Sequence, residues 1–298
     1  MNDATIHAAV RERGGFFQLS GQTILRLTGL DRVRYLNGQV SNDVRKLGDA
    51  ATLSACVMNA KGRLCAHVTI AKRDDSLFID AAPELRAPLA QRLERYIIAD
   101  DALLEDVSDE WALFHVVAES CAEAGSRQSR RLVPSGFDLI VPTGEAAALR
   151  ERLSAELVDI TPAVIESLRI ENGVPRWGAE LDESTLPAEA GLDLSAVDFH
   201  KGCYVGQETV SRIKSIGHVN RTLRFLVGGE AAIPVGAQLF AANGAPAGKV
   251  TSSAWSFALS RQVALGYVKR GVDAPTLLAR LGDEAGLEVE VRAVQHHF

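Results

Sequence analysis

The segment Lys201–Glu208 concentrates reactive and hydrogen-bonding side chains in a short stretch. It reads Lys-Gly-Cys-Tyr-Val-Gly-Gln-Glu, so a cation, a thiol, a phenol, an amide and a carboxylate surround two glycines. Core packing does not explain such a mixture, and glycine lets the backbone adopt positive φ and approach a ligand closely. A helix is predicted to start at Gln207. A glycine loop that leads into a helix N-terminus is typical of anion binding, because free N–H groups and the helix dipole meet there.

Cys203 differs from the other cysteines because its neighbours are polar. Lys201 and the following helix N-terminus would favour the thiolate form. That form would suit a nucleophile, a metal or cluster ligand, or a redox-sensitive thiol, and the alternative is a thiol that fills space in a tight loop. His200 and His218 are the histidines that folding could bring to it. The remaining cysteines have apolar neighbours, form no C-x-x-C pair and are predicted to be small buried hydrophobic residues: Cys56, Cys65 and Cys121.

Glu171 is the second candidate. Residues 162–172 are predicted to form a helix, with Pro162 at its first position. Val164, Leu168 and Glu171 then lie on one face, so that an apolar stripe ends in a carboxylate. A carboxylate that faces inward must be paired, protonated or used on a ligand. The alternatives are a solvent-exposed helix end and pairing with a core arginine.

Basic residues are densest between positions 201 and 224 of a chain whose net charge is −6. Such a cluster would suit a polyanionic tail, a phosphate or an acidic partner, and the alternative is a solvated helix face. The cluster comprises Lys201, Arg212, Lys214, His218, Arg221 and Arg224.

Composition excludes several classes of protein. The negative net charge argues against broad nonspecific binding to nucleic acid or acidic membranes. No apolar run approaches the ~20 residues of a membrane-spanning helix. The N-terminus lacks the basic and apolar regions of a secretory signal, and sparse cysteines suit a reducing compartment. We therefore expect a cytoplasmic protein.

The order of the expected elements predicts an α+β fold in two parts. Strands and helices alternate irregularly up to residue 220, without a dinucleotide-binding or P-loop motif. From residue 221 on, short strands alternate with Gly, Pro and Asn turns, which is typical of a small β-barrel or sandwich. The predicted domains are 1–220 and 221–298. Within the first, strands are expected at 22–28, 55–58, 64–70, 77–80, 111–118 and 137–141, and helices at 4–13, 144–157 and 162–172.

The segment Lys201–Glu208 resembles the K-G-C-Y-x-G-Q-E signature of the YgfZ/Iba57 family. Those are folate-binding proteins related to the aminomethyltransferase, or T-protein, of the glycine cleavage system. Further family motifs are matched in the expected order by Leu27–Val44, Ala60–Arg63, Leu168–Pro175, Gly248–Ser253 and Ala264–Val268.

This resemblance implies two α+β subdomains and a C-terminal antiparallel β-barrel around a central cavity that holds tetrahydrofolate or a derivative. It implies an accessory protein for the assembly or repair of iron–sulfur clusters, including those of radical enzymes that modify tRNA. The partners would be assembly factors or cluster-containing client enzymes. Cys203 would be the reactive or cluster-facing thiol, and no metal site is expected. The residues expected to hold the folate are Glu171, Lys201, Tyr204, Gln207, Glu208 and Arg212.

Departures from the aminomethyltransferases keep two alternatives open. Those enzymes carry acidic residues shortly after a G-G turn, where this chain has Ala66 and His67. Gln22 and Ile165 stand at the approximate positions of tryptophans that lie near the folate in some bacterial YgfZ proteins. The alternatives are a tetrahydrofolate-dependent one-carbon transferase or demethylase, and a non-catalytic interaction module.

Overall fold

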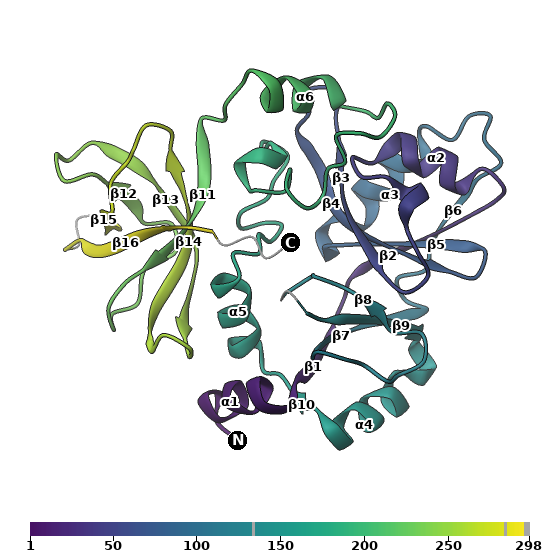
Figure 1. The fold of residues 1–298 in the computed structure, drawn as a ribbon, viewed down its shortest axis with the longest axis horizontal. Helices are drawn as coiled ribbons and strands as arrows, with labels where there is room; N and C mark the ends of the chain where they lie inside the picture. The colour runs from purple at the N-terminus through teal and green to yellow at the C-terminus, as the bar shows by residue number, and fades with distance from the viewer. Residues whose placement is uncertain (133–134, 283–284, 295–298) are drawn as a thin grey trace.

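Two five-stranded sheets and a closed barrel surround helix α5 (Pro162–Glu171) in the computed structural model (Figure 1). The structure describes residues 1–132, 135–282 and 285–294. The α+β class and the antiparallel C-terminal barrel predicted from the sequence are confirmed. None of the described helices combines the length and the apolar character needed to cross a membrane.

The first sheet is antiparallel, with strand order β3-β4-β5-β2-β6. In β4 burial alternates with the two-residue period of a strand. Ala66, Val68 and Ile70 are buried in an apolar core to which helices α2 and α3 also contribute. The side chains of His67 and Thr69, which alternate with them, therefore lie on the opposite face. The elements are α2 (Arg32–Gln39), α3 (Arg86–Glu94), β2 (Thr23–Thr28), β3 (Thr52–Met58), β4 (Leu64–Arg73), β5 (Ser76–Ala81) and β6 (Leu103–Asp106).

The second sheet has the order β10-β1-β7-β9-β8, and only its β1–β10 pair is parallel within the described residues. Phe16 and Phe114 pack with Leu149 and Leu153 of α4 on one face. Phe17 points to the other face, where it packs with residues of α1 and α5. The elements are α1 (Asp3–Arg13), β1 (Gly15–Leu19), β7 (Trp111–Val117), β8 (Arg127–Gln128), β9 (Phe137–Pro142), α4 (Ala146–Glu156) and β10 (Val158–Asp159).

The barrel follows helix α6 (Gln207–Ser215), and its strand order is β11-β14-β13-β12-β15-β16. Its first strand begins at Arg221, where the sequence predicts the second unit. The division into two domains, 1–220 and 221–298, stays a prediction. Helix α5 packs against β13 and β14 on the outside of the barrel. The strands are β11 (Arg221–Val227), β12 (Gln238–Phe240), β13 (Pro246–Ser256), β14 (Arg261–Lys269), β15 (Thr276–Arg280) and β16 (Leu287–Ala293).

The side chain of Glu180 joins residues 1–220, which we call the first lobe, to the barrel. This carboxylate is fully buried. One of its oxygens accepts hydrogen bonds from the hydroxyls of Thr251 (2.7 Å) and Ser252 (2.6 Å) on β13. The hydroxyl of Tyr267 on β14 donates to the Glu180 backbone carbonyl at 2.9 Å. Three barrel side chains are therefore fixed to a single residue of the lobe.

The second oxygen of Glu180 ties the same point to α5. It accepts from the Arg169 guanidinium at 3.1 Å and from the backbone N–H of Arg176 at 3.0 Å. Arg169 also forms a two-pronged ion pair with Glu166, at 2.8 and 2.9 Å. A buried carboxylate is tolerated only when its lone pairs are satisfied. The described partners of this one come from α5, from the segment that follows α5 and from β13.

We predict that Glu180→Ala lowers the free energy of unfolding by about 3–5 kcal/mol, because it leaves Arg169 buried without part of its counter-charge. Glu156→Ala is the matched control, since Glu156 is exposed at the end of α4. That control should change stability by less than about 0.5 kcal/mol. Urea unfolding followed by tryptophan fluorescence measures both, and equal effects of the two substitutions would contradict the tethering role of Glu180.

Candidate functional site

A cavity of about 870 Å³ lies between the two sheets and the segment that follows α5. Its volume falls within the range of small-molecule sites, ~300–1,000 Å³. The lining combines apolar walls with neutral and charged polar groups. These include Phe17, Leu19, Gln22, Asn42, Ser54, His67, Thr69, Asp80, Arg130, Arg131, Ile165, Arg169, Arg176, Trp177 and Leu192.

One wall of the cavity is the face of β3 and β4 that the core leaves free. His67 and Thr69 occupy this face because Ala66 and Val68 point into the core. The His67 Nε2 lies 2.8 Å from the Ser54 hydroxyl on β3. Burial, and then the charge of Arg131, lower the pKa of His67 to about 4. The imidazole is therefore neutral near pH 7, and it offers a polar but uncharged group to a ligand.

A half-buried arginine in the cavity lining pairs with a carboxylate from each sheet. Arg131 donates to both carboxylate oxygens of Asp80, at 2.8 and 2.9 Å, and to Asp138 at 2.8 Å. Burial raises the pKa of Asp80 despite the opposing charge of Arg131. Burial would also raise the pKa of Asp138. The charge of Arg131 and the hydrogen bond from His115 outweigh burial, so the pKa of Asp138 is lowered. Carboxylate oxygens accept more than one bond, so Asp80 can also accept from a ligand N–H.

Lys201 does not reach this cavity. Its ammonium donates to the backbone carbonyls of Asn37 and Val40, both at 2.7 Å, and of Asn42 at 2.8 Å. Those bonds use all three ammonium protons and satisfy carbonyls at the C-terminal end of α2. Burial lowers the pKa of Lys201 to about 8. In this structure, Lys201 fastens its own loop to the first subdomain and has no proton left for a folate tail.

The glycines of the same loop also have a packing role. Gly206 has φ 89°, and a Cβ there would lie 2.7 Å from the Asn59 carbonyl oxygen. Across the contact, Gly62 has φ 72°, and its Cβ would lie 2.8 Å from that of Thr209 on α6. The start of α6 therefore fits closely against the turn between β3 and β4, and only glycine allows both approaches.

The other residues predicted around this loop lie on or beside α6 and outside the cavity lining. Cys203 is exposed. Tyr204 is buried, and its hydroxyl has no hydrogen-bond partner among the described residues. Nowhere in the described part of the chain do three His, Cys, Asp or Glu side chains gather as a metal site. Gln207 is half-buried, whereas the remaining two predicted residues are exposed: Glu208 and Arg212.

Glu171 also lies outside the cavity lining. Its carboxylate accepts from the Ser167 hydroxyl at 2.8 Å, and its face of α5 packs towards α1. Ile165 and Arg169 line the cavity instead. Two residues along a helix correspond to a rotation of about 200°, so Glu171 and Arg169 point in nearly opposite directions. The predicted contact between Glu171 and a pterin therefore has no geometric support here and stays a prediction.

The cavity lining includes residues from two of the matched family motifs, Asn42 and Arg169 among them, and residues at which this chain departs from the family pattern. Gln22, His67 and Ile165 were each singled out as replacements, and all three line the cavity. Asp80, Arg131 and Trp177 were not identified as site residues. The alternation in β4 placed His67 on a face of the sheet, but nothing in the sequence indicates that Asp80 and Arg131 meet across two sheets.

Comparisons with known proteins agree with this architecture. Residues 221–298 match the glycine cleavage T-protein C-terminal barrel domain. An aminomethyltransferase of Rubrobacter xylanophilus is 27% identical, over 88% of this chain and 78% of that protein. A tRNA-modifying protein YgfZ of Yersinia pestis (strain Pestoides F) is 28% identical, over 72% of each chain. The crystal structure of glycine cleavage system aminomethyltransferase T from Bartonella henselae shares the fold with a TM-score of 0.85, at 17% identity over 100% of this chain and 90% of that one.

We predict that His67 makes stability fall as the pH drops from about 6.5 to 4. The folded-state pKa is about 4, against an ordinary value of 6.5, so the unfolded chain binds more protons in this window. The resulting loss is roughly 3 kcal/mol. His67→Gln should lack this part of the pH dependence in urea unfolding. An NMR titration of His67 with a midpoint near 6.5 would contradict the neutral imidazole.

We also predict opposite outcomes for two neighbours in the loop. Lys201→Met should lower the free energy of unfolding by about 3 kcal/mol, because three backbone carbonyls lose their buried donor. Cys203→Ser, at an exposed position, should change it by less than about 0.5 kcal/mol. Thermal and urea unfolding measure both. A neutral Lys201→Met variant would show that Lys201 does not anchor the loop.

Proposed function

We propose that this chain binds a folate and serves tRNA modification. The matches to YgfZ and to aminomethyltransferases support this proposal, because they indicate a YgfZ/aminomethyltransferase-like family. The observation that carries this proposal is the cavity of about 870 Å³ at the junction of the two sheets. The folate would be tetrahydrofolate or a derivative, with its pterin inside this cavity.

The cavity lining suits the two chemically different ends of a folate. A pterin is flat and carries amide and amine groups on its edge, which Trp177 and Ile165 would contact through their apolar surfaces and Asp80 through its carboxylate. The glutamate end is anionic. Arg130 and Arg176 line the same cavity with exposed side chains and would favour that charge. When bound, tetrahydrofolate supplies a carrier for one-carbon groups.

The cavity wall favours a non-catalytic use of the folate over transfer chemistry. A general base works best with a pKa near the operating pH, and the pKa of His67 is about 4. Ala66, the other residue at the position of the family's acidic pair, points into the core. The alternative, a tetrahydrofolate-dependent transferase or demethylase, rests on the shared fold and would be recognised by turnover of a methylamine-type donor.

We extend the proposal to the assembly or repair of iron–sulfur clusters, including those of radical enzymes that modify tRNA. The exposed thiol of Cys203 supports this role, because it is accessible to a cluster held by another protein. One thiol supplies a single ligand, so assembly factors or client enzymes would supply the others. Such an exchange would take place in the cytoplasm. The third alternative is a non-catalytic interaction module without a ligand, which would leave the polar lining of the cavity without a role.

Calorimetric titration with 5-formyltetrahydrofolate tests the folate site. We predict saturable binding to the wild type and about tenfold weaker binding to Trp177→Ala, because the pterin would lose an aromatic contact. Glu171→Ala is the comparison, and it should retain affinity because Glu171 lies outside the cavity lining. A loss of affinity confined to Glu171→Ala would indicate that the ligand binds beside α5 instead. The absence of binding to the wild type would contradict the folate role.

A further inference from the structure

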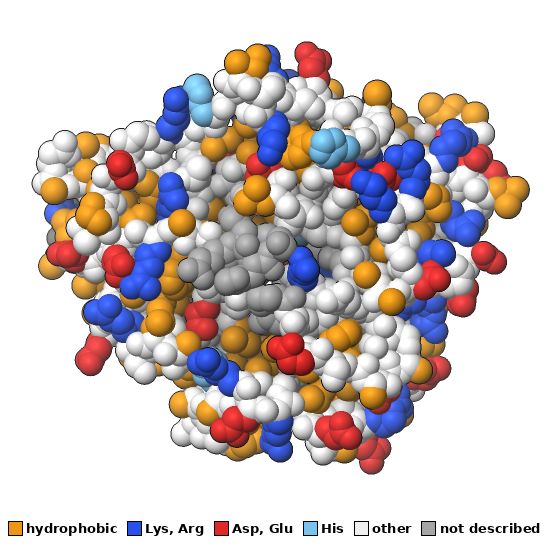
Figure 2. Space-filling view, in the orientation of Figure 1, with side chains coloured by type: hydrophobic (Ala, Val, Ile, Leu, Met, Phe, Trp, Pro, Cys, Tyr) orange, Lys and Arg blue, Asp and Glu red, His pale blue; other side chains and the backbone are white. Residues whose placement is uncertain are grey.

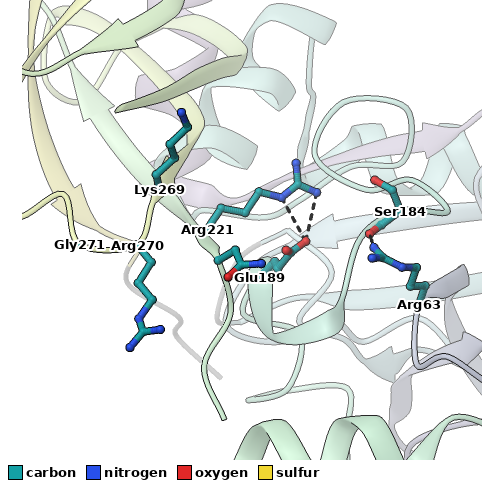
Figure 3. A pocket seen from close by; sticks show the side chains of 8 residues that line it. Arg63, Ser184, Glu189, Arg221, Lys269, Arg270 and Gly271 are labelled. Atoms are coloured by element: carbon teal, nitrogen blue, oxygen red, sulfur yellow. Dashed lines mark hydrogen bonds and ion pairs between the residues drawn. The ribbon is translucent and has the colours of Figure 1, made fainter. Parts of the chain in front are cut away.

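A second concavity, of about 920 Å³, lies between the barrel and the first lobe, and none of the described residues that line it also lines the central cavity. We call it the basic groove. Figure 3 shows Lys269 and Arg270 on the barrel side, Arg221 and Glu189 in the middle, and Arg63 and Ser184 on the lobe side. Arg221 begins β11, and Lys269 ends β14.

The charges of the basic groove are only partly compensated. The Arg221 Nε donates to one oxygen of Glu189 at 3.1 Å, and its Nη2 forms an ion pair with the same oxygen at 3.1 Å. The guanidinium also lies 4.2 Å from the centre of the Tyr267 ring. Arg63 donates to the backbone carbonyl of Ser184.

Within the described ranges, Arg63, Lys269 and Arg270 form no ion pair, although each lines the groove. The described lining therefore carries four cations and one carboxylate, an excess of three positive charges. A concave surface lined by one sign of charge concentrates its field and attracts the opposite charge. In a chain with net charge −6, this local excess indicates a binding site for an anion.

We propose that the basic groove binds a short acidic segment of a partner protein through its carboxylates. The pairing of Glu189 with Arg221 is an example of carboxylate recognition by a cation of this groove. Arg63 and Arg270 would pair with further carboxylates, since a guanidinium fork matches a carboxylate in shape. The exposed amide of Asn220 would serve the peptide backbone, because it both donates and accepts.

The groove suits an acidic peptide better than a nucleic acid. Proteins that bind single strands combine a basic track with aromatic side chains on which bases stack, and no aromatic residue is among the described residues that line the groove. A long phosphate backbone would also extend beyond the groove. On the face shown in Figure 2, acidic and basic side chains are interspersed, and a long polyanion would meet carboxylates there.

This inference is independent of the proposed folate role, and the test contains no folate. Fluorescence anisotropy would follow a fluorescein-labelled hexaglutamate peptide titrated with the full chain. We expect saturable binding that weakens as salt is added, because exposed charges are screened. The double variant Lys269→Gln/Arg270→Gln should bind about tenfold or more weakly, since two ion pairs are lost.

The double variant Arg261→Gln/Arg280→Gln is the matched control. It removes the same charge from exposed positions of the barrel that do not line the groove, and it should keep the affinity of the wild type. Thermal unfolding confirms that both variants are folded. An equal loss of affinity in the two variants would show that the net charge of the protein, and not the groove, determines binding. That result would overturn the proposal. Tighter, groove-dependent binding of a uridine oligonucleotide of matched charge would overturn it in favour of nucleic acid.

Discussion

The buried carboxylate of Glu180 fixes the barrel against the rest of the molecule. It accepts hydrogen bonds from Thr251 and Ser252 on one side and from Arg169 on the other. Arg169 also lines the central cavity. Arg169, which forms part of the cavity wall, is therefore held by the same carboxylate that positions the barrel, so displacement of the barrel would alter the cavity. Paired charges in a buried position favour one arrangement, because every shifted arrangement leaves a charge without a partner.

A second constraint joins the loop at residues 201–206 to the first subdomain. Lys201 binds three backbone carbonyls, and Gly206 fits against the turn that contains Gly62. The most conspicuous motif of the sequence thus owes much of its composition to packing. The exposed side chains of the motif, Cys203 and Glu208, are the ones that this packing does not use. The chemical groups of the loop and those of the cavity belong to separate places on the protein.

The sequence predicted what depends on local pattern and on resemblance. The helix expected at 162–172 is α5 (Pro162–Glu171), the strand expected at 64–70 is β4, and the barrel begins at Arg221. The inward carboxylate expected at Glu171 illustrates the limit. A periodic pattern shows that residues share a face, but not whether that face meets a cavity or, as here, another helix. Asp80 and Arg131 were missed because their pairing depends on two sheets that no local pattern brings together.

We propose that the folate binds in the cavity between the two sheets and not at the loop that contains Cys203. A crystal structure of the protein with 5-formyltetrahydrofolate would distinguish the two places. We expect density for the pterin against Trp177 and Asp80, with the glutamate end towards Arg130 or Arg176. Density beside Cys203 and α6, or beside Glu171, with the cavity filled only by water, would contradict it.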